Sequence, residues 1–316
     1  MSAVSRTRRV GISAAPSLPG PLRARFRRRA APYLYVAPAL LFLLALAVYP
    51  IVYNVRTSLT DLTVGTFLSG DAPFVGLDNY TKVLGDDAFL HAVGVSALFT
   101  VACIVLQFTI GLALAMFFAR PFPGHDVLRA LLVVGWLLPG VVSGNLFRFL
   151  LDGDSGVVPW AVNGVGLGQH SWLTDPDSAL WAAVATNVWV GIPFNMLLLL
   201  PGLQAIPDEL YEAAAIDGAG PWHRFRYITI PLLRPVALSV ILLGVIYTFK
   251  VFDVVYVLTG GGPVDATTVL PIEVYNVSLK FFRFGEGAAE STLLLVAMLA
   301  VAAVYLVLQR REERTV

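Results

Sequence analysis

The sequence predicts an all-α membrane protein with six transmembrane helices. Hydrophobic residues make up 57 % of its 316 residues and charged residues only 14 %, against roughly 25 % charged residues in soluble domains. Long uncharged runs recur along the chain, and each is of the length that crosses a bilayer as a helix. Basic residues collect on alternate loops between these runs, which is typical of a multi-pass membrane protein.

Each predicted span corresponds to an apolar run. The six spans are expected at residues 30–55, 92–119, 130–147, 178–207, 235–258 and 291–309. Five of the runs reach the roughly 18 residues that a spanning helix needs without a charged residue. The run that begins at Pro235 is uncharged only to Phe249, and Lys250 and Asp253 interrupt it before it continues to Leu258.

The charge distribution predicts the orientation in the membrane. Basic residues precede the first run, flank the turn between the second and third, lie between the fourth and fifth, and follow the sixth: Arg6 to Arg29, Arg120, Arg129, Arg224, Arg226, Arg234, Arg310, Arg311 and Arg314. The opposite loops are rich in acidic residues. The positive-inside rule therefore places both termini in the cytoplasm.

The domain organisation follows from the same runs. Residues 1–29 are rich in Arg, Ser and Pro without an apolar period, and we expect a disordered basic cytoplasmic tail. Residues 30–310 form one six-span domain, and residues 311–316 form a short cytoplasmic tail. Ala45-Leu46-Ala47 offers an alternative, a signal-peptidase site, but the apolar run continues beyond it.

A polar segment at 207–235 separates the fourth and fifth runs on the cytoplasmic side. Asp208, Glu209 and Glu212 suit the positive end of a short helix, and the alanines at 213–215 favour it. Gly218 and the Gly220-Pro221 pair predict a turn. A second short helix is expected from Trp222 to Ile230, with its end at Pro231. This helix-turn-helix would expose small residues to a partner protein.

The residues of this segment resemble the cytoplasmic "EAA" loop of ATP-binding-cassette importer permeases. The resemblance rests on a spaced pattern: Glu212, Ala213, Ala214, Asp217, Gly218, Ala219, Phe225, Ile228, Ile230, Pro231 and Pro235. The stretches 74–80, 163–176 and 249–263 are similar to other parts of carbohydrate-importer permeases. The similarity covers about residues 32–310 and implies the type I importer permease fold.

The resemblance also implies the partners. A permease of this kind pairs with a second homologous permease, two copies of a cytoplasmic ATPase and an extracellular solute-binding protein, in contact with membrane lipid. ATP and Mg²⁺ would be held by the ATPase, and this chain would carry no cofactor. The residues that would dock the ATPase are Glu212, Ala213, Ala214, Asp217, Gly218, Phe225 and Pro231.

Polar and aromatic residues in the fourth and fifth spans are candidates for the path of a sugar. Amides and rings that can bind hydroxyls and stack on sugar faces are Asn187, Trp189, Asn195, Tyr247 and Phe252. Gly191 and Pro193 are expected to break the fourth span beside them. Lys250 and Asp253 are three residues apart, so we expect them on one helix face near the outer end, as a pair. Gly260, Gly261, Gly262 and Pro263 would form a flexible outer gate.

Other classes of function have less support. A six-span secondary carrier for a small polar solute is the alternative, although such a carrier has no use for an ATPase-docking loop. The chain contains no P-loop, no His-Glu-x-x-His sequence and no metal-ligand spacing among its four histidines, so we expect no enzyme activity and no metal site. A net charge of only +1 argues against nucleic-acid binding.

Overall fold

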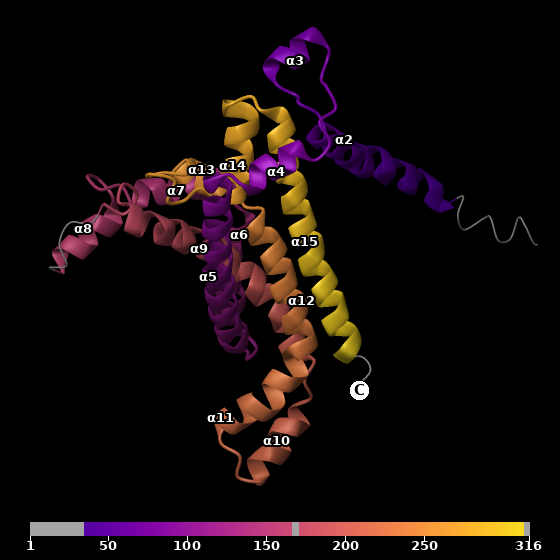
Figure 1. The fold of residues 1–316 in the computed structure, drawn as a ribbon. Helices are drawn as coiled ribbons and strands as arrows, with labels where there is room; N and C mark the ends of the chain where they lie inside the picture. Colours follow the sequence, from indigo (N-terminus) through magenta and orange to yellow (C-terminus); the bar gives the residue numbers. More distant parts are fainter. Residues whose placement is uncertain (1–34, 166–170, 313–316) are drawn as a thin grey trace, which may run out of the picture. The chain divides into compact units, whose positions relative to one another are not determined.

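The computed structural model describes residues 35–165 and 171–312 (Figure 1). The regular elements of these residues are helices, with one isolated antiparallel bridge between Thr60 and Phe74, so the predicted fold class is confirmed. The expected tail at residues 1–29 lies outside the described residues, as do residues 313–316. The chain divides into a unit that ends at Tyr53 and a unit that begins at Asn54.

The described part of the first unit belongs to one apolar helix. The segment Tyr35–Ser58 is long and apolar enough to cross a membrane, and it passes through a π-helical turn, η1 (Leu44–Val48), into α2 (Tyr49–Ser58). The rings of Tyr49 and Tyr53 stack one turn apart, with centroids separated by 6.3 Å. This helix corresponds to the predicted first span.

The second unit supplies the other spanning helices. Those long and apolar enough are α5 (Asp87–Phe118), α9 (Pro176–Gln204), the segment Pro221–Phe249, and Phe284–Val307 within α15 (Phe284–Glu312). The expected third span is not one straight helix. It consists of α6 (His125–Leu137) and α7 (Gly140–Leu150), which meet at 100°. Pro139 lacks the N–H that a continuous helix needs and forces Leu138 into an extended conformation.

Shorter elements join the spans. They are α3 (Val64–Ser69), α4 (Asp78–Leu84), α8 (Val157–Gly164), α10 (Asp208–Ile216), α13 (Asp253–Leu258), α14 (Leu270–Tyr275) and η3 (Asn276–Lys280). The spanning segment Pro221–Phe249 is made of α11 (Pro221–Arg224), η2 (Phe225–Thr229) and α12 (Ile230–Phe249). Within the second unit, Figure 1 shows α10 and α11 at one end, together with the C-terminal end of α15, while α7, α13 and α14 lie toward the other end.

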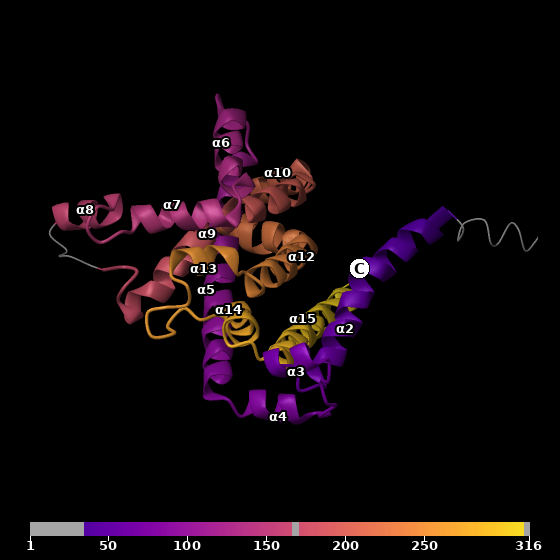
Figure 2. The same ribbon diagram turned by 90° about the horizontal axis from the view of Figure 1, so that it is seen from above.

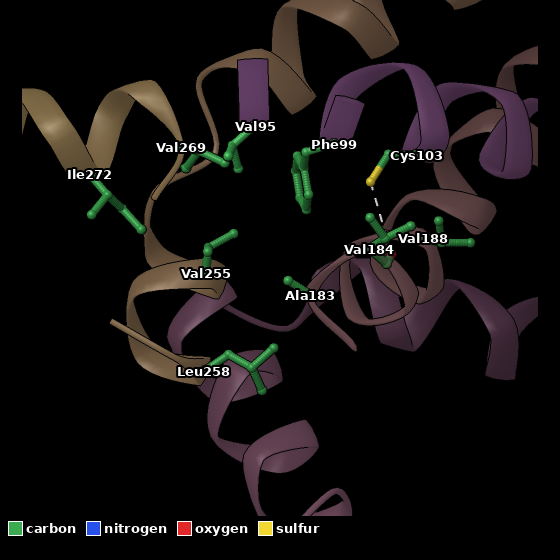
Figure 3. Close-up of a cluster of buried hydrophobic side chains, with 10 residues drawn as sticks. All are labelled: Val95, Phe99, Cys103, Ala183, Val184, Val188, Val255, Leu258, Val269 and Ile272. Atoms are coloured by element: carbon green, nitrogen blue, oxygen red, sulfur yellow. Dashed lines mark hydrogen bonds between the residues drawn. The ribbon is translucent and has the colours of Figure 1, made fainter. Parts of the chain in front are cut away.

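The core of the second unit forms where α5 packs against α9, and small residues allow the close approach. The Cβ of Asn195 lies against Gly111, and the side-chain amide of Gln107 lies against Gly191. Figure 3 shows the buried cluster that extends from this contact toward α13 and α14, including Phe99, Val184, Val255 and Ile272. Seen from above, the shorter elements α13 and α14 lie beside α5 (Figure 2). This packing holds α13 beside the two long helices.

Two proline-based expectations are wrong. α9 is unbroken through Pro193. Gly191 instead allows close contact with Gln107, and its carbonyl accepts a hydrogen bond from Asn195 Nδ2 at 2.9 Å. The helix that begins at Pro221 does not end at Pro231. The π-helical turn η2 lies directly before this proline, with Ile230 N–H donating to Phe225 O, and the wider turn accommodates the proline ring.

Candidate functional site

The turn after α10 explains the spacing between the alanines and Gly218. The N–H of Gly218 donates to Ala215 O at 3.1 Å, and the N–H of Ala219 donates to Ala214 O at 2.8 Å. These two bonds form a Schellman motif, in which the residue after the helix adopts a left-handed conformation. Gly218 has φ +80°, a conformation that side chains disfavour. The turn predicted at Gly218 is confirmed.

The helix pair around this turn presents small and acidic groups to its surroundings. Glu212, Ala213, Asp217 and Gly218 are exposed, whereas Ala214 is half-buried. Asp208 and Glu209 occupy the first turn of α10, where negative charge is favourable. Nothing lies within 4 Å of a Cβ added to Gly218, so a partner's backbone can approach the turn closely.

α10 is fixed against the helix that follows the turn. The hydroxyls of Tyr211 and Thr229 lie 3.0 Å apart, and Thr229 is buried. Phe225 is half-buried and its ring lies 5.6 Å from that of Trp222. Pro231 is exposed within α12. A cavity of about 700 Å³ separates this pair from the adjacent ends of α5 and α9.

A second cavity, which we call the central cavity, lies at the meeting point of two helix breaks. It has a volume of about 270 Å³. One break separates α6 from α7, and the other separates α12 from α13. Its lining combines amide, hydroxyl, carboxyl and aromatic groups: Gln107, Trp136, Asn187, Phe194, Tyr247, Thr248 and Asp253, with Gly140, Gly191 and Gly244. This mixture can bind both hydroxyls and the apolar face of a sugar ring.

The structure brings together three of the seven predicted path residues in this cavity, namely Asn187, Tyr247 and Asp253. The other four lie elsewhere. Asn195 is buried and bonds within its own helix, and Trp189 packs on Gly135 and Phe147.

Phe252 belongs to a different aromatic group. Its ring stacks on that of Tyr256 at 4.9 Å. Lys250 is exposed, with its Nζ 5.0 Å from the ring centroid of Tyr247.

The expected pairing of Lys250 with Asp253 on one helix face is wrong. α12 ends at Phe249, and Asp253 is the first residue of α13. The two residues therefore do not share a helix, and within the described residues no ion pair joins them. Asp253 instead lies in the central cavity with Asn187 and Tyr247.

Sequence reasoning missed several residues of the central cavity, chiefly Gln107, Trp136, Phe194 and Thr248. Gln107 carried a signal, because it is an isolated amide in an otherwise apolar run and a buried amide needs partners. Its Nε2 donates to Asn187 O at 2.9 Å. Nothing in the sequence showed that the break at Pro139 would bring Trp136 and Gly140 to the same place.

The predicted outer gate is a hydrogen-bonded turn in the structure, whereas we expected a loose segment. Thr267 Oγ1 donates to Gly262 O at 2.8 Å, and Thr268 Oγ1 donates to Gly261 O at 3.0 Å. The hydroxyls of Thr259 and Thr267 lie 2.6 Å apart. Gly260 and Gly261 have positive φ, and Gly261 and Thr268 are buried.

The chain is similar in sequence to known permeases of transport systems. Residues 107–314 match the family described as "Binding-protein-dependent transport system inner membrane component". The chain is 37 % identical over 285 residues to the trehalose/maltose transport system permease protein MalF of Thermococcus litoralis, covering 90 % of this chain and 95 % of that protein. It is 33 % identical over 304 residues to the diacetylchitobiose uptake system permease protein DasB of Streptomyces coelicolor, covering 93 % and 92 %.

The fold comparison agrees with the sequence comparison. A chain of a bacterial ABC transporter involved in the import of the acidic polysaccharide alginate superposes with a TM-score of 0.78 at 19 % identity. The match covers 92 % of this chain and 98 % of that one. The architecture is therefore that of a type I ABC importer permease.

These findings define an inner-membrane transport permease. The chain belongs to the family of binding-protein-dependent transport system inner membrane components. This membership does not favour the alternative of a secondary carrier, and it is consistent with a membrane subunit that is not itself a catalyst.

Proposed function

We propose that this chain is one of the two permease subunits of an ATP-driven importer for a sugar or a related polyol. The observation that carries the proposal is the helix pair α10–α11, whose turn at Gly218 presents small and acidic residues at one end of the second unit (Figure 1). The relatives named for trehalose/maltose, sulfoquinovosyl glycerol and diacetylchitobiose support a carbohydrate or glycoside as the substrate.

The helix pair would be the docking element for a cytoplasmic ATPase. Glu212 and Asp217 offer carboxylates to basic groups of the partner, and Ala213 and Gly218 allow close backbone approach. Ala214 and Phe225 are half-buried and support the shape of the element, and Pro231 adds an exposed contact surface at the start of α12. Two copies of the ATPase would bind ATP and Mg²⁺. Conformational changes that accompany ATP hydrolysis would move α10 and the helix that begins at Pro221.

The central cavity would form part of the sugar path, shared with a second homologous permease. Asn187 and Thr248 can bond to hydroxyls, Asp253 can accept from them, and Tyr247 can stack on a ring. The backbone at the two helix breaks beside the cavity can change conformation during transport, as in other transporters with discontinuous helices. An extracellular solute-binding protein would deliver the sugar to the opposite end from α10–α11.

Both termini would lie in the cytoplasm. The C-terminal end of α15 lies at the same end of the second unit as α10–α11 (Figure 1), which supports the orientation expected from the arginines.

Uptake by a reconstituted importer tests the proposed function. Proteoliposomes containing both permeases and the ATPase should accumulate a labelled disaccharide only with internal ATP and the external solute-binding protein. Accumulation driven by a proton gradient without the ATPase would contradict the proposal and would favour a secondary carrier.

A further inference from the structure

The turn between α7 and α8 borders a small open cavity, which we call the outer cavity. Its volume is about 320 Å³, at the lower end of the range of about 300–1,000 Å³ found for ligand pockets. Asp154, Ser155, Val157, Trp160 and Asn163 line it, together with two glycines. No residue of the central cavity takes part in its lining, so it is a separate site.

Hydrogen bonds to the side chain of Asp152 hold the backbone at one side of the outer cavity. Oδ1 of Asp152 accepts hydrogen bonds from Asp154 N–H at 3.2 Å, Ser155 N–H at 2.9 Å and Ser155 Oγ at 2.9 Å. These bonds, with the Ser155 backbone bond foremost, lower the pKa of Asp152. Gly156 is buried, and a Cβ there would lie only 2.6 Å from Leu150 O. The turn that forms one side of the cavity is therefore held in place by its own hydrogen bonds.

The groups that face the outer cavity are unused within the described part of the chain. The carboxylate of Asp154 and the side-chain amide of Asn163 make no hydrogen bond there. Trp160 is 77 % exposed, so the face of its ring is open to a ligand. A free carboxylate, a free amide and an open aromatic face lie around one small cavity.

We propose that the outer cavity is a subsite for one neutral sugar ring, separate from the central cavity. The apolar C–H face of a sugar stacks on an indole ring, and its hydroxyls donate to a carboxylate and exchange hydrogen bonds with an amide. The negative charge of Asp154 disfavours acidic sugars. This subsite rests on the proposed function, because it would receive the sugar at the end of the permease opposite the ATPase.

Sugar binding to the assembled importer tests the subsite. The complex of both permeases and the ATPase is placed in nanodiscs without the solute-binding protein, and saturation-transfer NMR is recorded with maltose and with trehalose. Trp160→Ala and Asp154→Asn should each weaken binding at the outer cavity about tenfold. Trp160→Phe keeps an aromatic face and should bind nearly as wild type. Tyr247→Ala, in the central cavity, should leave the outer signal in place.

The outcomes separate the subsite from the proposed function. Trp160 and Asp154 are exposed, so their variants should still assemble with the ATPase, which is checked by co-purification. If Tyr247→Ala removes all sugar signal and Trp160→Ala removes none, the outer subsite is overturned and the importer assignment stands. If neither probe binds the wild-type complex, the subsite is also overturned, and ATP-driven uptake of another solute would still support the importer.

Discussion

The carboxylate of Asp253 occupies the space in which a side chain at Gly140 would begin, because a Cβ at Gly140 would overlap its oxygen atoms. Gly140 is the first residue of α7 and Asp253 is the first residue of α13. The two helix breaks are thereby joined at one point, where both residues line the central cavity. This contact ties the kink at Pro139 to the end of the fifth span.

We expect Gly140→Ala to lower the thermal stability of the permease, by about 1–3 kcal/mol for an overpacked site. Asp253→Ala removes the overlapping atoms, so the double variant should be less destabilised than the sum of the two single variants. Thermal unfolding in detergent of the four proteins gives the coupling. If the stability changes of the two single variants add up to that of the double variant, Gly140 and Asp253 do not interact.

Tyr247→Ala should slow sugar uptake about tenfold, since an aromatic contact of this kind contributes about 1 kcal/mol beyond its buried area and hydroxyl bonding adds to it. Tyr247→Phe should keep most of the rate, because its ring still meets Phe194, whose centroid lies 5.4 Å away. The measurement is the initial rate of labelled disaccharide uptake into proteoliposomes.

Asn195→Ala is the matched comparison for the fourth span. Asn195 is buried, and within the described residues its side chain bonds to Gly191 of its own helix, so its loss should reduce stability and leave the ranking of transported sugars unchanged. A changed ranking in Asn195→Ala together with an unchanged rate in Tyr247→Ala would place the sugar path elsewhere.

The orientation in the membrane can be measured with single cysteines in a Cys103→Ser background. Cysteines introduced at Ser155 and Asp265 should react with an impermeant maleimide from outside intact cells, and one at Ala215 should react only after permeabilisation. All three positions are exposed, whereas Thr229 is buried and would be a poor reporter. Labelling of Ala215→Cys from outside would reverse the topology.

Glu273 on α14 should make stability depend on pH. Burial is the main cause that raises its pKa, and the nearby Asp265 and Asp86 add to the effect. A raised pKa means that the folded protein holds the proton more tightly than the unfolded chain, so this group favours folding at low pH. That contribution is lost as pH rises from the ordinary value through the raised one.

Glu273→Gln should remove this dependence. The variant should gain thermal stability relative to wild type at pH 8 and gain little at pH 4, because a neutral amide resembles the protonated acid. Unfolding temperatures in detergent across this range provide the test, and an equal difference at both pH values would mean that Glu273 does not titrate in this way.

The sequence predicted the helical class and the spans well, because both depend on local hydrophobicity. Its errors arose where long-range contacts decide the local geometry. Pro139 breaks its span but Pro193 does not. The local sequence around each proline predicts a helix break in both cases. In the structure, α9 continues through Pro193, and Gly191 is the point where α9 packs against Gln107 of α5.

The two candidate sites differ in how far they could be predicted. The turn at Gly218 is a local motif, and its hydrogen bonds join residues within six positions of one another, so the spacing of alanines and glycine predicted it. The central cavity joins Gln107 of α5, Asn187 of α9, and Tyr247 and Asp253 at the junction of α12 and α13, which are three distant parts of the chain. Only the fold brings these residues together, which is why Phe252 and Trp189 were predicted there and lie elsewhere.

The central claim, that α10–α11 docks a cytoplasmic ATPase, is tested most directly by co-purification of the ATPase with two glycine variants. Gly218 has φ +80°, whereas Gly220 has φ −69° and nothing lies within 4 Å of an added Cβ at either position. A left-handed conformation costs a residue with a side chain roughly 1–2 kcal/mol. We predict that Gly218→Val inserts into the membrane but retains little ATPase, while Gly220→Ala retains as much ATPase as the wild type. Equal ATPase recovery with both variants, and with Glu212→Lys, would contradict it.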